Sequence, residues 1–397
     1  MWTDSTTSNR SGRLVPTIRG QMAFVPNDLP LQVQWTSELI STLSDAERAV
    51  GQLRGVGLNL PNPNLLIRPF VRREAVLSSR IEGTQAELRD LYLFDEIREH
   101  KTKPAVPDVQ EVANYVRALE YGIRRCSELP VCLRLIRELH EILMHNVRGH
   151  QSIPGQFRSE QNWIGPQDCP IEQASYVPPP PEQMKAALDA FERFINSPLQ
   201  HVTVLVWLAM VHYQFEAIHP FRDGNGRIGR LLITLLLCAK NILDKPLLYL
   251  SAYFERNRRE YYKHLLRVST HGEWVEWILF FLRGVTEQSI DAFERSRQLM
   301  ALQQEYREMV GSQSWSALRL KLVDFLVEQP IVTIVTVRKH FDISYPAAAN
   351  NIAALVKVGI LKEITGSKRN RIYMAQKVWE IINRPSATTE VNNTKQL

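Results

Sequence analysis

Cysteine is scarce in this sequence of 397 residues, and no two cysteines stand in a C-x-x-C pair. The four are Cys126, Cys132, Cys169 and Cys238, most of them within apolar helical patterns. Disulfide-stapled domains and small zinc domains need paired cysteines at short spacings, so the sequence argues against both classes. We expect reduced thiols and no structural metal.

Long hydrophobic runs are also missing. The apolar stretch 231–239 is closed off by Arg230 and Lys240, whereas a membrane-spanning helix needs about 20 apolar residues. The first residues, 1–6, are polar and have no apolar segment after a basic start, which is not the pattern of a secretory signal. We expect a cytoplasmic protein with no membrane contact.

An excess of charge of one sign is likewise small. Lys and Arg number 48 against 42 Asp and Glu, a net charge of +6. Over a chain of this size, such an excess does not by itself diagnose nucleic-acid binding. Because a single core rarely exceeds about 250–300 residues, the length predicts one large domain with appended units.

What the sequence does contain is mainly helical periodicity. Apolar residues recur every three or four positions in successive segments, which predicts an all-α body. These segments are 36–54, 68–82, 85–99, 108–126, 131–146, 182–197, 201–217, 226–241, 258–270 and 273–309. Both ends of the chain are polar and aperiodic, so we expect tails there.

Residues 155–181 interrupt the helical pattern. Pro166, Pro170 and the proline run 178–181 alternate with β-favouring residues such as Trp163 and Tyr176. This predicts a long extended loop or a short β-hairpin. Loops of this length in compact domains are usually functional, so we interpret the segment as a flap over a site. The alternative is a surface insertion.

After residue 310 the pattern changes to short elements. We expect three helices and then two strands around a turn at 366–370, an order typical of a winged helix-turn-helix. The elements are 318–328, 336–341, 345–357, 360–364 and 371–374.

The charge of this C-terminal region leaves its partner open. Lys368, Arg369 and Arg371 gather at the expected wing, which favours contact with DNA. The expected recognition helix, however, offers only amides and Lys357, which favours docking to another protein.

The most informative segment is His219–Arg230, with the sequence HPFRDGNGRIGR, which follows one apolar helix and opens another. Gly224 and Gly226 permit backbone conformations in which successive N–H groups point at one spot. The following helix adds the positive end of its dipole. Arg227 and Arg230 lie on neighbouring positions of that helix and present two guanidinium groups. The segment predicts a site for adjacent phosphates.

Two further side chains complete the equipment for nucleotidyl or phosphoryl transfer. Asp223 supplies a hard oxygen ligand, and Mg²⁺ uses only one or two protein carboxylates beside substrate phosphates and water. His219 precedes the loop, and a neutral imidazole can take a proton from a hydroxyl that attacks phosphorus.

This segment matches the motif H-x-F-x-[DE]-G-N-G-R-x-x-R of the Fic family, and residues 20–310 resemble Fic proteins in their helical body and upstream flap. The resemblance implies transfer of AMP from ATP to a Ser, Thr or Tyr hydroxyl of a target protein. It implies that His219 is the base and Asp223 the Mg²⁺ ligand. It also implies a nucleotide-binding set of Glu82, Phe221, Arg222, Asp223, Gly224, Asn225, Gly226, Arg227, Arg230, Tyr261 and Tyr262.

A second match lies upstream, where Ser78–Gly83 resembles the N-terminal form of the family's inhibitory motif, [ST]-x-x-x-E-[GN]. Gly83 predicts a helix stop and Thr84–Glu87 a capping box for the next helix, which places Glu82 at the C-terminal end of its own helix. A negative charge there opposes the helix dipole, so Glu82 should have a cationic partner.

The resemblance supplies Arg230 as that partner. Glu82 would then occupy the guanidinium group meant for the ATP γ-phosphate, and Ser78, Glu82 and Gly83 would form an inhibitory element. The alternative is a solvated Glu82 that pairs with Arg80 or Arg73.

Several other residues can be interpreted either as functional or as structural. Tyr261 and Tyr262 fall where related sequences carry a tyrosine pair near the adenine, but core packing explains them equally well. His212 fits helix packing better than a metal site. His140 and His145 are one residue too far apart for the zinc motif H-E-x-x-H.

For the partners, the resemblance places a target protein along the flap near residues 155–181. There, Phe157, Arg158 and 162–165 would pair with it by β-strand addition. Family members often dimerise, so a homodimer is a further expectation.

The resulting division of the chain has five parts. They are a disordered tail (1–20), an N-terminal helical region with the inhibitory helix (21–105), a Fic catalytic domain (106–310), a winged helix domain (311–383) and a tail (384–397). Two alternative functions stay open. Glu82 could position a water that removes AMP from modified proteins, or the chain could be a DNA-binding regulator whose helical body senses nucleotide.

Overall fold

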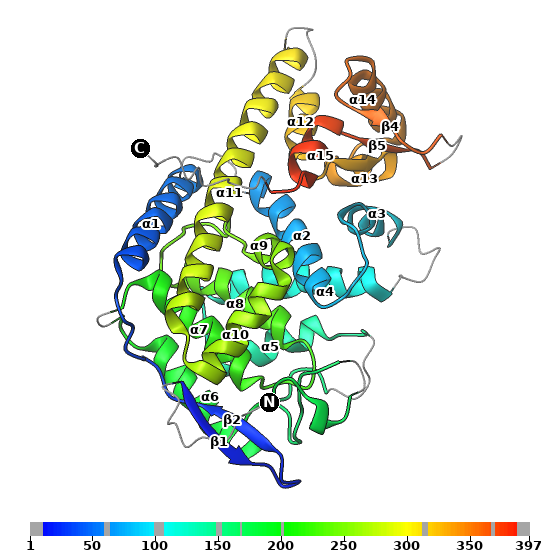
Figure 1. Ribbon diagram of the computed structural model, residues 1–397. Helices are drawn as coiled ribbons and strands as arrows, with labels where there is room; N and C mark the ends of the chain where they lie inside the picture. The colour runs from blue at the N-terminus through cyan, green and yellow to red at the C-terminus, as the bar shows by residue number, and fades with distance from the viewer. Residues whose placement is uncertain are drawn as a thin grey trace.

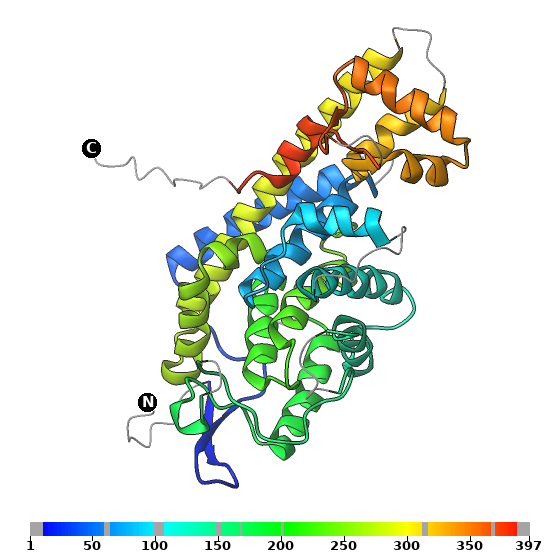
Figure 2. The same ribbon diagram turned by 90° about the vertical axis from the view of Figure 1, so that its right-hand side faces the viewer.

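The computed structural model describes residues 11–58, 64–98, 107–147, 153–166, 169–199, 202–311, 317–366 and 370–386. These residues form a helical body crossed by one long helix, α11, which continues upward to a smaller C-terminal module (Figure 1). The view turned by 90° shows the same module at the far end of α11 (Figure 2). The prediction of a mainly helical chain is confirmed.

The helices of the body correspond closely to the predicted segments. They are α1 (Ser37–Leu58), α2 (Asn64–Ile81), α3 (Leu88–Arg98), α4 (Pro107–Arg125), α5 (Leu133–Leu143), α6 (Pro181–Asn196), α7 (Val204–Ile218), α8 (Asn225–Ala239), α9 (Ser251–Arg256), α10 (Arg258–His271) and α11 (Trp274–Gly311). The short helix α9 was not predicted, because six residues are too few to show a helical period.

The two most apolar helices, α7 and α8, form the centre of the body. Nearly every residue of both helices is buried, because other helices surround them on all sides. The loop between them therefore begins and ends on rigid, fully packed elements. This loop carries the motif singled out in the sequence.

The N-terminus departs from the expected tail. Residues 12–16 form β1 (Gly12–Pro16), which pairs antiparallel with β2 (Met22–Pro26). Phe24 N–H donates to the Val177 carbonyl over 2.9 Å, and Ala23 packs against Ile171 and Val177. The flap thus supplies the apolar partner for a hairpin whose polar flanks suggested disorder. Residues 1–10 lie outside the described residues.

The segment 155–181 is extended, as predicted. Its only regular features in the described part are a 3-10 turn, η1 (Ile171–Gln173), and an antiparallel bridge between Ile164 and Tyr176. The Tyr176 hydroxyl donates to the Ala217 carbonyl over 2.8 Å, which ties the flap to the end of α7.

The C-terminal module contains the three helices and two strands in the predicted order, and it adds one strand and one helix. Its elements are α12 (Ala317–Glu328), β3 (Ile331–Thr333), α13 (Ile334–Phe341), α14 (Tyr345–Lys357), β4 (Lys362–Glu363), β5 (Ile372–Met374) and α15 (Gln376–Asn383). Of these, β3 and α15 were not predicted. The strands form one antiparallel sheet in the order β3-β5-β4, and β4 and β5 are shorter than predicted. Lys368 and Arg369, which we predicted at a wing, lie outside the described residues.

The second expected tail begins later than predicted. Arg295 Nη2 of α11 donates to the Arg384 carbonyl over 2.9 Å, and Arg73 Nη2 of α2 donates to Ser386 Oγ over 3.0 Å. Residues 384–386 are therefore packed on the body, because two arginines meet their polar groups. Residues 387–397 lie outside the described residues.

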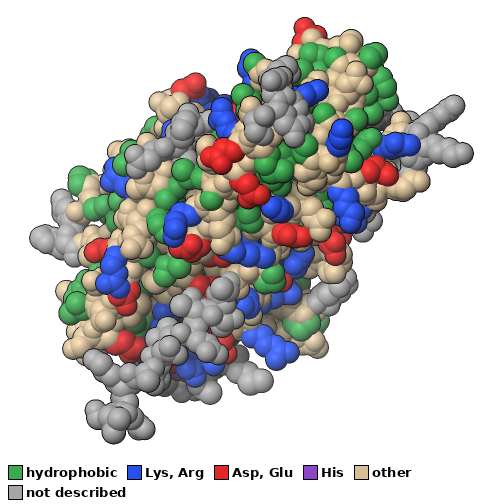
Figure 3. Space-filling model, turned by 90° about the horizontal axis from the view of Figure 1, so that it is seen from above, with side chains coloured by type: hydrophobic (Ala, Val, Ile, Leu, Met, Phe, Trp, Pro, Cys, Tyr) green, Lys and Arg blue, Asp and Glu red, His purple; other side chains and the backbone are tan. Residues whose placement is uncertain are grey.

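One face of the molecule agrees with the small net charge. On the face seen from above, Lys and Arg side chains are interspersed with Asp and Glu (Figure 3). Within the described ranges, none of the helices combines the length and the apolar character needed to cross a membrane.

Candidate active site

The loop between α7 and α8 has a fixed shape. His219 and Gly224 both adopt left-handed backbone conformations, with φ of 50° and 78°. The Asn225 side chain closes the loop, because its Oδ1 accepts from Phe221 N–H and its Nδ2 donates to the Phe221 carbonyl, both over 2.8 Å. Asn225 and the buried Phe221, both predicted to contact nucleotide, thus shape the loop from inside.

A histidine of α5 packs against this loop and donates a hydrogen bond to it. The His140 ring stacks on Phe221 with centroids 3.7 Å apart. Its Nδ1 accepts from Gly155 N–H over 2.9 Å, so its Nε2 carries the proton and donates to the Asp223 carbonyl over 3.0 Å. Burial lowers the pKa of His140 to about 4, which keeps the ring neutral. Sequence reasoning missed this role, because only the fold brings α5 beneath the loop.

His219 is oriented as a proton acceptor. Its Nδ1 lies 3.3 Å from the Glu216 carbonyl, a partner that can only accept, so Nδ1 bears the proton and Nε2 has the free lone pair. Burial and, next, the charge of Arg158 lower the pKa of His219 to about 4. The imidazole is therefore neutral at pH 7 and can take up a proton.

Arg158 holds the backbone on which His219 sits. Its Nε donates to the His219 carbonyl over 3.0 Å, and its Nη2 donates to the Pro179 carbonyl over 2.5 Å. Arg158 is buried, and its neighbour Phe157 packs against Phe221 with centroids 5.1 Å apart. Both side chains point into the loop, so they help to fix its shape, and the docking of a target along this edge stays a prediction.

The C-terminal end of α2 meets α8 at Arg230. The helix stops in a Schellman motif: Thr84 N–H donates to the Ser79 carbonyl, and Gly83, at φ 99°, donates to the Arg80 carbonyl. Gly83 is thus the predicted helix stop. Glu82 is the last residue before it and projects its carboxylate toward α8.

Glu82 pairs with Arg230 and with neither of the alternative partners near it on α2. Arg230 Nη2 donates to Glu82 Oε1 over 2.7 Å, and Arg230 Nε donates to Ser78 Oγ over 2.9 Å. The Arg230 side chain is only 1% exposed, so this contact satisfies a buried charge. Burial raises the pKa of the Glu82 carboxyl, but the charge and hydrogen bond of Arg230 outweigh burial and hold that pKa below its usual value.

Gly226 makes room for this pair. A methyl group at Gly226 would overlap Glu82 Oε1 and Arg230 Nη1. In the first turn of α8, only glycine lets the carboxylate of α2 lie directly on the helix. The Glu82 side chain thus occupies space at the N-terminal end of α8, where helix dipole and N–H groups favour an anion.

The second arginine of the motif is held from α4. Arg227 Nη1 lies 3.5 Å from Glu111 Oε2, which also accepts from Thr84 Oγ1 over 3.2 Å. The predicted capping box is therefore wrong, because Thr84 turns toward Glu111. The cap of α3 is instead formed by Asp90, whose Oδ2 accepts from Glu87 N–H over 2.9 Å.

The more exposed motif residues face outward. The Asp223 carboxylate is 55% exposed, accepts from Gly224 N–H over 2.6 Å and lies 3.7 Å from Arg227 Nη2. Arg222 is half exposed and lies 3.8 Å from Glu160. In the described part of the chain, three or more His, Cys, Asp and Glu side chains never gather as a metal cage would require.

The two tyrosines of the predicted pair differ in position: Tyr261 lies in the core and Tyr262 lies beside the site. Tyr261 is buried, and its hydroxyl bonds to His212 Nε2 over 2.8 Å, which makes both residues part of the packing. Tyr262 is 41% exposed, and its hydroxyl lies 3.4 Å from the Ile81 carbonyl, beside Glu82.

Glu216 is a further carboxylate near Arg230, and its place beside this arginine was not predicted. Glu216 Oε1 is buried without a hydrogen-bond partner among the described residues, and a methyl group at Gly229 would overlap it. Burial raises the pKa of Glu216 to about 8, and the charge of Arg230 offsets this only in part. Glu216 is therefore mostly protonated at pH 7.

Taken together, a helix N-terminus, two buried guanidinium groups and a neutral histidine form an arrangement that can receive phosphate groups and accept a proton. Residues 40–124 match the Fic/DOC family N-terminal region, and residues 130–237 match the Fic/DOC family. The chain therefore contains a Fic/DOC N-terminal region and a Fic/DOC domain.

Curated relatives are similar over the same part of the chain. The protein adenylyltransferase Fic of Drosophila erecta is 26% identical over 217 residues, which is 54% of this chain and 40% of that relative. The protein of the same name from Drosophila melanogaster matches to the same extent. The chain thus spans about 40% of the length of these relatives.

Solved structures support the fold. A Fic family protein from Desulfovibrio desulfuricans G20 superposes with a TM-score of 0.53 at 18% identity, covering 86% of this chain and 97% of that chain. A Fic domain containing signaling protein from Bacteroides thetaiotaomicron VPI-5482 gives a TM-score of 0.51 at 19% identity, covering 64% and 95%.

Proposed function

We propose that this protein is a protein adenylyltransferase that transfers AMP from ATP to a hydroxyl group of a target protein. The observation that carries the proposal is the neutral His219 beside the anion-receiving N-terminus of α8. The names of the curated relatives support the same activity.

In this mechanism a target hydroxyl attacks the α-phosphorus of ATP. His219 Nε2 accepts the hydroxyl proton, the new oxygen–phosphorus bond forms, and the bond from the α-phosphorus to the bridging oxygen breaks. Pyrophosphate leaves with the electron pair of that bond. The N–H groups at Gly224–Gly226 and the Arg227 guanidinium stabilise the charge that develops on the phosphate oxygens.

The residues present also fit a bound Mg²⁺. Asp223 offers one exposed carboxylate at the mouth of the loop, and one carboxylate suffices where substrate phosphates supply the other oxygens. When bound, the ion would neutralise phosphate charge and aid the leaving group.

The enzyme is restrained by its own Glu82. The carboxylate that lies on Arg230 takes the guanidinium contact that the γ-phosphate needs, and its charge repels phosphate at the N-terminus of α8. Ser78 strengthens the restraint because it accepts from the same guanidinium. ATP therefore binds in an unproductive position until Glu82 moves.

The proposal is tested by incubating the protein with α-labelled ATP and Mg²⁺ and measuring label on protein. We expect weak label with wild type, strong label with Glu82→Gly and none with Glu82→Gly/His219→Ala. Glu128→Gly, which removes an exposed glutamate in the turn after α4, should behave like wild type.

Other outcomes decide between the alternatives. If no variant labels protein although ATP binds, transfer is wrong. Release of AMP from a modified protein would then favour the removal reaction. If Glu82→Gly labels no better than wild type, the restraint is wrong while the transferase activity stands.

We also infer that the C-terminal module is a winged helix that docks to DNA or protein. Its order of helices and its antiparallel sheet support this. Asn351 of α14 is buried and accepts from Arg319 Nε over 2.9 Å, so this amide is engaged within the module and does not face bases. Loss of a gel shift in the triple variant Lys368→Ala/Arg369→Ala/Arg371→Ala would favour DNA, whereas no shift at low salt excludes it.

A further inference from the structure

A second cavity lies on the other side of the inhibitory helix. It has a volume of about 440 Å³ and is enclosed by α2, α3, α9, α15 and residues 384–386. Arg73, Val76, Leu77 and Arg80 line it from one face of α2. Ser78, on a different face of the same helix, and Glu82, just after its end, contact Arg230. The cavity is therefore separate from the active site but shares a helix with it.

The lining of this cavity is rich in arginine. Its charged residues are Arg73, Arg80, Arg89, Arg256 and Arg384, against Glu87 and Glu255. Cavities of this size are typical of small-molecule sites, and an excess of guanidinium groups selects anions, phosphates above all.

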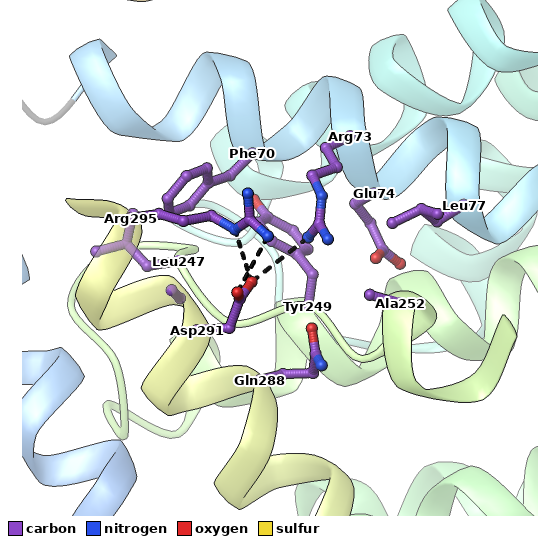
Figure 4. Close-up of a pocket in the computed structure, with 11 residues that line it drawn as sticks. Phe70, Arg73, Glu74, Leu77, Leu247, Tyr249, Ala252, Gln288, Asp291 and Arg295 are labelled. Atoms are coloured by element: carbon purple, nitrogen blue, oxygen red, sulfur yellow. Dashed lines mark hydrogen bonds and ion pairs between the residues drawn. The ribbon is translucent and has the colours of Figure 1, made fainter. Parts of the chain in front are cut away.

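Three of these arginines are already held in place. Arg256 pairs with Glu287, Arg384 Nη1 donates to Gln298, and Arg73 contacts Asp291 at 3.8 Å. Figure 4 shows Asp291 between Arg73 of α2 and Arg295 of α11, so this carboxylate is shared by two guanidinium groups.

The other two, Arg80 and Arg89, have free donors. Among the described residues, neither makes a hydrogen bond or an ion pair with another side chain. Arg80 lies in the last turn of α2, and Arg89 lies in the first turn of α3. Trp379, half-buried edge-on against Tyr92, closes one wall of the cavity beside them.

We propose that this cavity is a second anion site, which takes a small ligand with more than one phosphate between Arg80 and Arg89. Such a ligand joins the end of α2 to the start of α3. The turn 82–87 that connects them carries Glu82, so occupation of the cavity holds Glu82 on Arg230. This regulatory step rests on the proposed function, whereas the binding step does not.

Binding is tested first, by calorimetry with inorganic tripolyphosphate. Arg227→Ala serves as the background because it weakens the anion site of the motif loop. Adding Arg80→Ser and Arg89→Ser should lower the affinity about tenfold or more, as expected for losing charge-assisted hydrogen bonds. Adding Arg48→Ser and Arg297→Ser, which remove exposed arginines elsewhere, should leave it unchanged. Equal affinity in both variants overturns the site.

Regulation is tested by labelling at a fixed ATP concentration. Tripolyphosphate competes with ATP in every variant, so the informative quantity is the excess inhibition of wild type over Glu82→Gly. We expect an excess of several fold that disappears with Arg80→Ser/Arg89→Ser. Equal inhibition of wild type and Glu82→Gly overturns the regulatory step. If Glu82→Gly shows no labelling at all, the proposed function fails while the calorimetric result still decides the site.

Discussion

Arg230 of α8 and Glu82, the residue just after α2, are 148 positions apart in the sequence and form a 2.7 Å hydrogen-bonded ion pair. The guanidinium is buried, and removing its anionic partner without a replacement costs free energy. Glu82 and a substrate phosphate are therefore alternative partners of the same Arg230 guanidinium group. The energetic cost of releasing Glu82 falls when a phosphate takes its contact.

Gly226→Ala should reveal the tight fit of this pair. The new methyl group overlaps Glu82 Oε1, so the Glu82 side chain must shift, and we expect a loss of about 1 kcal/mol in the free energy of unfolding. In Glu82→Gly the overlap with the carboxylate is gone and only the flexible end of Arg230 must move, so the loss should be smaller, because alanine also favours the helix. Urea unfolding of the two single variants and the double variant measures this coupling. Additive changes would mean that Glu82 does not lie on Gly226.

Acid should destabilise the protein through three histidines whose pKa values are lowered in the folded chain. Burial lowers the pKa values of His140 and His219 to about 4 and that of His212 to about 3. Between these values and the ordinary 6.5, the unfolded chain binds protons that the folded chain does not. Stability should therefore fall as pH drops from 6.5 to 4, by up to about 1.4 kcal/mol per histidine and pH unit. Urea midpoints measured across this range test the expectation, and midpoints independent of pH would contradict it.

The lowered pKa of His219 should determine the pH below which activity is lost. With a pKa of about 4, His219 stays neutral down to mildly acidic pH. The labelling rate of Glu82→Gly at saturating ATP should be flat from pH 6 to 8 and should fall only below about pH 5. A midpoint near 6.5 would show that His219 is solvated in the working enzyme.

Glu216→Gln should improve stability in alkali. Burial raises the pKa of Glu216 to about 8 and that of Glu74 to about 7, both above the value of 4.5 for an exposed glutamate. The folded chain keeps these protons longer than the unfolded chain, so wild-type stability is lost as pH rises from 4.5 to about 8. Glutamine cannot ionise, so thermal unfolding of Glu216→Gln should depend less on pH between 6 and 9, with Glu74 causing the remaining loss. A pH dependence identical to wild type would refute the buried, protonated state.

Arg158→Lys should separate catalysis from nucleotide binding. A single ammonium group cannot reach both the His219 and the Pro179 carbonyls, so the imidazole loses its fixed position. Small displacements of reacting groups can cost about 100-fold, and we expect a fall of 10- to 100-fold in labelling by the Glu82→Gly background. ATP affinity, measured by calorimetry, should change little. An equal loss of affinity would show that Arg158 holds the phosphate loop itself.

Much of the site could be predicted because its residues are close together in the sequence. His219–Arg230 forms one continuous loop and helix start, so spacing alone indicates an anion site. Gly83 and the position of Glu82 at a helix end likewise follow from local rules, and the structure places both as predicted.

The remaining parts depend on contacts between distant segments. His140, Arg158 and Glu111 act on the loop from three separate elements, and nothing in their neighbouring residues distinguishes them from surface charges. The hairpin β1–β2 was missed because its apolar residues pack on the flap, about 150 residues later. Thr84 shows how a local pattern can mislead. Its sequence predicts a helix cap, but its hydroxyl instead donates to Glu111 of a distant helix.

Arg295 gives the C-terminal module a structural role of its own. Its buried guanidinium pairs with Asp291 and donates to the carbonyls of Ile381, Ile382, Arg384 and Pro385. Truncation after α11 would leave Arg295 with one carboxylate and a set of unmet donors inside the protein. The module is therefore not an interchangeable accessory: any domain grafted in its place would have to present backbone carbonyls to the same arginine.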